Sequence, residues 1–581
     1  MNELTPENGT RQIIGNLHRQ RDELMRLPPE KALERIMDAE HPAALVHALA
    51  DQDFHVLVNE IGPEDALPVL ALASERQWEH LLDVEGWAAD RLALADTDRR
   101  LDLLYRADPN RLVRWLASDH TEFLELYFYR TIEVYIREHD QDPSTLPPDC
   151  VTLDDVFYYR IMERSDPDDP SPRDPELYQR LATNIIERLA DHDHIFYQNV
   201  LLETVSIIPA EVEEESYRLR NVRMAEKGFL PFDEAVGIYQ APPAAGTDGA
   251  GNSTPRPQSE AQHRGPAPVL PAALTAPGNI FSKALAHTGS DERRGALQVA
   301  FAGLCNRIGV ADQAVVKSRR DLEAIVSKTT GYLGIALELL AGEDRSLTPE
   351  TAAAIMASRP LVDLFKVGYG AAAALKHQAD RWRGASWFQR QRLPLSFWGT
   401  QWMGVLGGLL IKRPLYFDNY RSGVIYREFA TLAEVSETRN ALTAAMAMDA
   451  LLDAIALRPP PTKPPLLIYK NLLLTAWARD RHQLDGPLSP VGADTMRRFF
   501  TWLWNAENPP FTIDDTRRSA FVDWLAARSG MPADEMGNRY GQVLDALFNE
   551  IEEELGSVAI RDLEPRYVSQ LLLVAPSSSQ K

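Results

Sequence analysis

Two stretches of the chain are similar enough to be copies of one unit. Residues 41–61 and 108–128 both carry a proline at their second position, followed by apolar residues at helical spacing, in the aligned pairs Pro42/Pro109, Leu45/Leu112, Val46/Val113, Leu49/Leu116, Ala50/Ala117 and Leu57/Leu124. Proline is favoured in the first turn of a helix, and leucines three or four residues apart share one helix face. The repeat therefore predicts short stacked helices, which offer a surface for partners more often than a reaction pocket.

The length of the chain, 581 residues, requires more than one hydrophobic core. We predict an all-α fold with a short, solenoid-like helical-repeat array over residues 11–240 and a C-terminal all-helical domain over 280–575. A flexible linker is placed between them at 241–279, because residues 241–268 are dense in Ala, Pro, Gly and Ser and lack large apolar side chains. A segment of this composition cannot bury enough surface to offset its ordering entropy.

Two local patterns predict helix boundaries. Thr152 and Asp155 form a capping-box pattern, which predicts a helix over 152–164. Residues 211–240 begin with acidic side chains and contain Gly228, so a helix is expected that ends at this glycine.

An uncharged stretch, residues 395–411, raises the question of a membrane span. It is shorter than the roughly 20 apolar residues that a spanning helix needs, and it contains Ser, Thr, Gln and four glycines. A buried core helix is therefore predicted, with a span as the alternative, and Gly404 and Gly408 would allow close helix packing. Residues 12–137 show no strand alternation.

The charge balance limits the possible partners. The net charge of −23, from 84 acidic and 61 basic residues, repels phosphate backbones and disfavours general nucleic-acid binding. The chain has only two cysteines, Cys150 and Cys305, and its first residues lack a basic segment followed by an apolar run. These features predict a cytoplasmic protein with reduced thiols.

Two clusters are candidates for binding chemistry. Asp191, His192, Asp193 and His194 form a weak metal-site candidate, but neighbouring residues on a helix point apart, so a solvated helix-end turn is the favoured interpretation. The basic, aromatic stretch 376–392 could contact phosphates or an acidic partner through Lys376, Arg381, Trp382, Arg383, Trp387, Arg390 and Arg392. The favoured interpretation is that these arginines pair with the chain's own acids while the aromatic rings pack inside.

The remaining motifs indicate no cofactor and favour a function other than catalysis, without excluding an enzyme. His41, His47 and His55 lie in the first repeat, but their spacing does not place them on one helix face, so they are interpreted as surface or interhelix polar residues. Residues 404–413 lack the Gly-Lys-Ser/Thr ending of a phosphate-binding loop. No nucleophile elbow, Rossmann fingerprint or zinc-protease helix occurs in the sequence.

Three segments resemble a known family. Residues 41–82, 151–161 and 220–239 (HPAALVHALADQDFHVLVNEIGPEDALPVLALASERQWEHLL, VTLDDVFYYRI and RNVRMAEKGFLPFDEAVGIY) resemble a bacterial family catalogued only as a domain of unknown function. This resemblance implies no functional residues. Residues 28–130 also resemble the cytosolic N-terminal domain of bacterial magnesium transporters and flagellar motor switch repeats, although the membrane domain of such transporters is not found.

The function expected first is that of a protein-binding or scaffold module, with another protein as the partner and no cofactor. An enzyme of unrecognised type, with a pocket near residues 387–413, is one alternative. The other is a nucleic-acid-associated regulator that uses residues 376–392.

Overall fold

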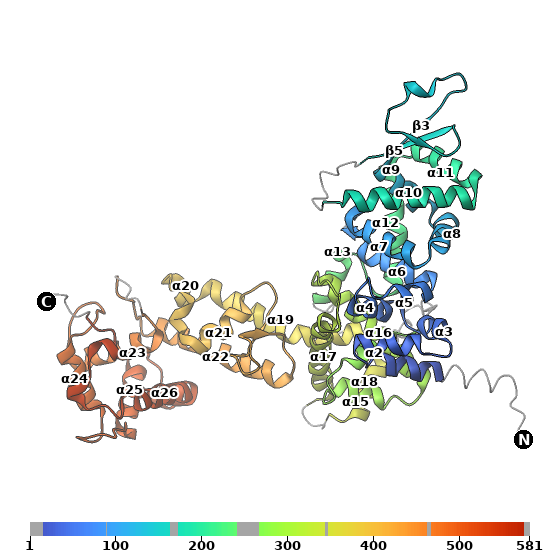
Figure 1. Ribbon diagram of the computed structural model, residues 1–581. Coiled ribbons are helices and arrows are strands. Elements are labelled where there is room, and N and C mark those ends of the chain that lie inside the picture. Colours follow the sequence, from blue (N-terminus) through green and yellow to red (C-terminus); the bar gives the residue numbers. More distant parts are fainter. Residues whose placement is uncertain are drawn as a thin grey trace, which may run out of the picture. The chain divides into compact units, whose positions relative to one another are not determined.

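The computed structural model describes residues 16–88, 90–162, 172–240, 266–342, 347–461 and 466–574. It is 67% helical and 4% strand, so the prediction of an almost entirely α-helical chain is confirmed (Figure 1). The chain forms two compact units, the first unit Met1–Lys366 and the second unit Val367–Lys581.

The predicted linker lies mostly outside the described residues, at 241–265. Its described remainder contains helix α14 (Leu270–Ala273), in which Leu270 is buried. The two compact units divide elsewhere, within helix α19 (Leu361–Ala385), and the predicted domains at 11–240 and 280–575 stay a prediction.

Short helices build the beginning of the first unit, as the proline-led repeats predict. They are α2 (Pro29–Met37), α3 (Pro42–His47), α4 (Asp51–Ile61), α5 (Leu67–Leu72), α6 (Glu75–Glu85), α7 (Leu94–Ala107), α8 (Pro109–Asp119) and α9 (Thr121–Thr131). Pro42 and Pro109 both stand at the first helical position, and the Asp108 side chain accepts the Arg111 N–H at the start of α8.

The two sequence copies fold as α3–α4 and α8–α9, but they turn at different places. With the copies aligned 67 positions apart, α9 begins at Thr121, three positions later than the start of α4 at Asp51. A uniform solenoid of identical units is therefore not confirmed. What both copies share is a proline-led helix and buried leucines, including Leu45 and Leu112.

Small antiparallel sheets interrupt the helices. Strand β1 (Trp87–Ala88) pairs with β2 (Arg91–Leu92), and the order in the second sheet is β3 (Ile132–Ile136), β5 (Phe157–Ile161) and β4 (Val151–Thr152), with the 3-10 turn η1 (Pro143–Thr145) between β3 and β4. These strands were not expected from the sequence pattern.

The helix predicted over 152–164 is wrong for the residues that are described. The Thr152 hydroxyl accepts the Asp155 N–H at 2.9 Å, as a helix cap would, but Asp155 then has a positive φ of 60° and the chain reverses. The aromatic segment Phe157–Ile161 pairs with β3 instead. The same hydroxyl–amide bond serves a turn as well as a helix start, and aromatic residues favour the strand.

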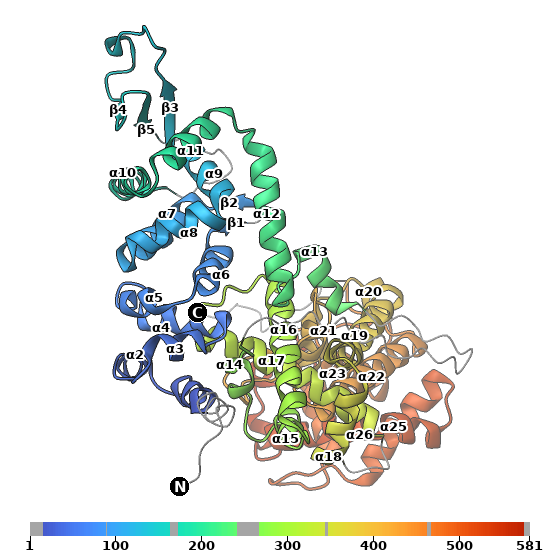
Figure 2. The same cartoon turned by 90° about the vertical axis from the view of Figure 1, so that its right-hand side faces the viewer.

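Longer helices follow, and the predicted stop at Gly228 is confirmed. They are α10 (Pro175–His192), α11 (His194–Ser206) and α12 (Pro209–Glu226), then α13 (Phe232–Ala235) and the 3-10 turn η2 (Val236–Tyr239). Gly228 has a φ of +86°, and an added Cβ would lie 2.5 Å from the Cα of Gly303. Only glycine meets both demands, so α12 ends here and approaches the later helices closely (Figure 2).

The rest of the first unit packs around two long helices. After α14 come α15 (Ile280–Ala286), α16 (Asp291–Ala311), α17 (Arg319–Ala341) and α18 (Pro349–Ser358). Within the described residues, α17 is the one helix long and apolar enough to cross a membrane, but 67% of its apolar window is buried inside the protein. This burial is typical of a core helix.

The second unit contains α20 (Trp387–Arg390), η3 (Leu395–Trp398), α21 (Gly399–Leu409), β6 (Tyr416–Phe417), β7 (Tyr426–Arg427), α22 (Leu432–Ala454), α23 (Tyr469–Arg481), α24 (Ala493–Leu503), α25 (Asp515–Ser529), α26 (Ala533–Leu555), η4 (Ile560–Asp562) and η5 (Pro565–Tyr567). The uncharged stretch forms η3 and α21, with Trp398 and Leu406 buried. Gly404 and Gly408 do allow close packing, but against the β6–β7 hairpin: an added Cβ on Gly404 would lie 2.3 Å from the Phe417 ring.

Candidate functional site

The Asp191–His194 cluster lies at the junction of α10 and α11. Asp193 ends α10 and begins α11, where its carboxylate accepts the N–H groups of Ile195 and Phe196, each at 3.0 Å. The His194 imidazole is 3.8 Å from Asp154, and no group of three or more metal-ligating side chains occurs in the described part of the chain. The cluster therefore has the geometry of a capped helix junction.

The aromatic residues of the stretch 376–392 face the interior of the second unit. The indole N–H of Trp382 donates to Asp449 at 3.2 Å, and that of Trp387 donates to the carbonyl of Leu457 at 3.1 Å. The backbone N–H groups of Trp387 and Phe388 also donate to Asp449. These contacts occupy both indole N–H groups of the stretch.

The basic residues of the same stretch differ in their surroundings. Lys376 pairs with Asp380 at 2.9 Å and Arg390 with Asp453 at 2.6 Å. Arg381, Arg383, Arg390 and Arg392 are all exposed. A binding role for these residues stays a prediction.

A cavity of about 860 Å³ adjoins this stretch, lined by Trp382, Trp387, Asp449 and Asp453 among others. Asp449 already accepts three hydrogen bonds and Asp453 already pairs with Arg390. The acids of this cavity are therefore occupied by the protein itself.

Two cavities of the first unit adjoin different faces of α6. This helix begins with a reciprocal capping box between Ser74 and Gln77, which fixes its orientation. Successive residues of a helix point about 100° apart, so Glu79 and Asp83 face one cavity while His80 and Val84 face the other. We refer to them as the His120 pocket and the His80 pocket.

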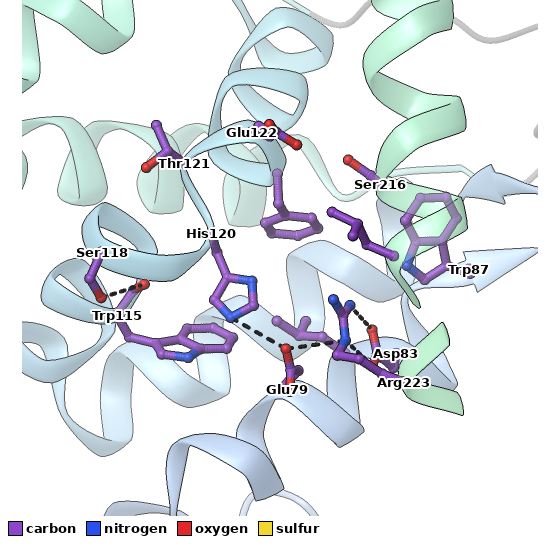
Figure 3. Close-up of a pocket in the computed structure, with 13 residues that line it drawn as sticks. Glu79, Asp83, Trp87, Trp115, Ser118, His120, Thr121, Glu122, Ser216 and Arg223 are labelled. Atoms are coloured by element: carbon purple, nitrogen blue, oxygen red, sulfur yellow. Dashed lines mark hydrogen bonds and ion pairs between the residues drawn. The ribbon is translucent and has the colours of Figure 1, made fainter. Parts of the chain in front are cut away.

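The His120 pocket has a volume of about 320 Å³ (Figure 3). Arg223 donates to Asp83 at 2.7 Å and lies 3.1 Å from Glu79, whose other neighbour is the His120 imidazole at 3.7 Å. The His120 ring packs on Trp115, with centroids 4.2 Å apart. Burial raises the pKa of Glu79, although the charge of Arg223 opposes this shift. Glu79, Asp83, Arg223 and His120 thus each lie within ion-pair distance of at least one other of these four groups in this pocket.

The His80 pocket has a volume of about 460 Å³ and is mostly apolar. Its walls come from α4, α6, α12, α16 and α17, together with the loop between α16 and α17. Cys305 lies in the wall, but burial raises the pKa of its thiol to about 12. This thiol is protonated near neutral pH and is a weak nucleophile.

A chain of charged groups supports one wall of the His80 pocket. Glu85 accepts a hydrogen bond from Nε2 of His55 at 2.7 Å and pairs with Arg100. Burial favours the neutral form of Glu85, but the hydrogen bond from His55 and the charge of Arg100 outweigh it and lower its pKa. His55 is thus an interhelix polar residue, as predicted, and its ring orientation is fixed by a carboxylate.

Asp53 holds the N-terminus of α14 against α4. Its carboxylate accepts the N–H groups of Val269 at 2.7 Å and Leu270 at 3.2 Å, and its side chain is buried. Burial raises its pKa from 3.8 to about 6, against the lowering effect of these two hydrogen bonds.

Replacing Asp53 by asparagine is expected to change how stability depends on pH. In the folded wild type this carboxyl takes up a proton near pH 6, well above its unfolded pKa, so its contribution to the free energy of unfolding rises as pH falls from 7 to 5. The contribution of this group is about 1 kcal/mol over that interval. Urea denaturation of both proteins at pH 7 and pH 5 measures it. A wild type–D53N stability difference that is the same at both pH values would contradict the assignment.

His80 is the least satisfied polar residue of the His80 pocket. It is 1% exposed, and its Nδ1 has no hydrogen-bond partner in the described part of the chain. The ring lies between His55 and Phe229, with both centroid distances 6.1 Å. Burial, and after it the charge of Lys227, lowers its pKa well below the ordinary value. The imidazole is therefore neutral, with one N–H and one lone pair.

The sequence did not reveal His80, Glu85 or Arg220, which also lines the His80 pocket, as site residues. The one signal in α6 is that Gln77, His80 and Asp83 recur every three residues among large apolar side chains, and all three are buried. A polar stripe on the buried face of a helix indicates interior hydrogen bonding, but it does not distinguish a pocket from a packed core.

Comparisons with known proteins identify a family. No curated protein and no solved structure matches the chain, and the likeness to magnesium-transporter domains is not shown. One family model matches residues 12–574, nearly the whole chain, and its description is a family of unknown function. The chain therefore belongs to this family, DUF6178.

Proposed function

We propose that the first unit binds a small organic molecule in the His80 pocket. The observation that carries the proposal is His80, which lines this cavity and whose buried Nδ1 has no hydrogen-bond partner in the described part of the chain. A buried polar atom left without a hydrogen bond costs about 1–3 kcal/mol. A ligand that pairs with it recovers that free energy, which gives the pocket a specific point of recognition.

The size and lining of the pocket fit this role. Its volume of about 460 Å³ lies within the range of roughly 300–1,000 Å³ that is usual for small-molecule sites. Val56, Val84, Met224 and Phe229 supply apolar surface, while a few polar groups converge on the same space. The ligand is thus expected to have an apolar body and one polar end.

The loop between α16 and α17 forms the rim of the pocket. Ala314, Val316 and Lys317 line the cavity, and Val315, in the same loop, is 70% exposed. An exposed apolar side chain at a cavity rim is typical of an entrance for apolar molecules.

Val84→Trp tests the proposal, because the larger side chain occupies the pocket. The probe is N-phenylnaphthylamine, a neutral compound whose fluorescence increases in apolar surroundings. The wild type is expected to bind it at a saturable site, and V84W should bind at least about tenfold more weakly, since the indole takes the volume that the probe needs.

Ser118→Trp is the matched control, since Ser118 lines the His120 pocket instead. It is expected to leave binding of the probe within about twofold of the wild type. If the wild type shows no saturable site, or if V84W binds as the wild type does, the proposal fails.

A protein-binding or scaffold role has a different basis. Leu202 and Val205 lie three residues apart on α11 and are exposed, and the exposed Ile208 immediately precedes α12. Exposed apolar side chains that lie close together are typical of interaction surfaces. Nothing in the described residues indicates what would cover them, so the small-molecule proposal is the better supported.

A further inference from the structure

In the His80 pocket, the acidic side chains all have partners within the protein. Glu85 pairs with Arg100, Asp53 accepts two backbone N–H groups, and Asp96 pairs with Arg99. A cationic ligand would have to compete with these bonds, whereas an anionic ligand would not.

Arg220 is the basic group of the wall that lacks an acidic partner. Its Nε donates to the backbone carbonyl of Asp83 at 2.7 Å and its Nη1 to the side-chain carbonyl of Asn221 at 3.0 Å. Both carboxylate oxygens of Asp83 are bound by Arg223, and no carboxylate in the described part of the chain forms an ion pair with Arg220. Burial lowers the pKa of Arg220, and Asp83 only partly opposes this shift.

The charged groups with the largest effect on His80 are basic. Lys227, His55, Arg220 and Arg76 all disfavour its protonation, in addition to burial. Lys227 is paired with Asp51 at 2.9 Å and Arg76 with the same carboxylate at 3.1 Å, so among these three cations Arg220 is the one without a carboxylate partner in the described residues. At the rim, Lys317 adds a second cation, which is exposed.

We propose that the ligand of the His80 pocket is an organic acid, with an apolar body in the cavity and its anionic group bound by Arg220 and by Nδ1–H of His80. This inference rests on the proposed function and names the ligand class. Arginine forms charge-assisted hydrogen bonds with carboxylates and sulfonates in a low-dielectric site. A neutral imidazole donates one further hydrogen bond without any change of protonation.

Two probes that differ by one acidic group test this proposal on the full chain. Anilinonaphthalene sulfonate carries the ring system of N-phenylnaphthylamine with an added sulfonate. The wild type is expected to bind the sulfonate at least about tenfold more tightly than the neutral compound. Arg220→Met should abolish that preference while leaving the neutral compound within about twofold, and Arg220→Lys should restore part of it.

A variant at the exposed rim keeps the proposal testable if the Arg220 variants do not fold. Lys317→Met removes an exposed charge and should weaken binding of the sulfonate about two- to threefold, with no effect on the neutral probe. If the wild type binds both probes equally, or if R220M weakens both alike, the anion proposal is overturned while the pocket proposal stands. If neither probe shows a saturable site that V84W removes, both proposals fail.

Discussion

Replacing Gly228 by alanine is expected to destabilise the first unit by about 2–4 kcal/mol. The new Cβ would stand 2.5 Å from Cα and O of Gly303, and alanine would have to adopt a φ of +86°. The backbone strain costs about 1–3 kcal/mol, and relieving the clash forces α12 away from α16. Urea denaturation, together with hydrogen exchange of peptides from α12 and α16, measures the loss and shows where it occurs.

Gly303→Ala is the matched control for this contact. An added Cβ at Gly303 would find its nearest neighbour, the Cα of Gly228, at 3.9 Å, an ordinary van der Waals distance. This variant is expected to be as stable as the wild type or slightly more so, since alanine favours the helix. Equal effects of the two substitutions would show that the approach of these backbones is not what limits the structure. Because α12 and α16 both line the His80 pocket, G228A should also weaken binding of the neutral probe.

Removing the carboxylate of Asp98 is expected to cost about 3–5 kcal/mol of unfolding free energy. Asp98 is 1% exposed and accepts two hydrogen bonds from Arg173, at 2.7 and 2.8 Å, and one from the Tyr127 hydroxyl at 2.8 Å. In Asp98→Ala the Arg173 guanidinium stays buried without its counter-charge, and this uncompensated charge is the main cost. The midpoint of urea denaturation reports the effect.

Asp96→Ala provides the contrast, because the Asp96–Arg99 pair lies on the surface of the same helix. Its side chains are 48% and 62% exposed, and exposed pairs contribute at most about 1 kcal/mol. A D98A variant no less stable than D96A would mean that the buried pair is not needed for stability. Asp98→Asn should fall between them, since the amide oxygen keeps one of the acceptors while the charge is lost.

The sequence predicts a helix end well where the backbone conformation at that end suits only one type of residue. Gly228 meets that condition, and the stop was confirmed. The Thr152 pattern does not, because a hydroxyl that accepts a nearby N–H can close a turn as well as start a helix. There the aromatic residues from Phe157 to Ile161 decide the outcome through strand pairing with Ile132–Ile136.

The candidate site is harder to predict, because its partners are distant in the sequence. His55 and Glu85 are 30 residues apart, and Arg220 joins the same wall from α12. The sequence around each of these three residues is that of an ordinary helix. Tertiary packing alone makes His80 an unpartnered group, and no local pattern carries that information. Residues 376–392 show that a local pattern can also suggest a site where the structure uses the residues for packing. In this basic, aromatic run Trp382 donates to Asp449 inside the unit, and Arg390 forms an ion pair with Asp453.

The contact between Asp53 and the start of α14 has a practical consequence for dissecting the chain. It joins residues on opposite sides of the segment 241–265, as do the Asn306 hydrogen bond to the Lys227 carbonyl at 2.7 Å and the ion pair of Arg319 with Glu60 at 2.8 Å. A polypeptide shortened to residues before that segment would keep His80 and Arg220 but lose the wall formed by α16 and α17. The smallest polypeptide that contains the complete pocket therefore extends past the segment and includes α17.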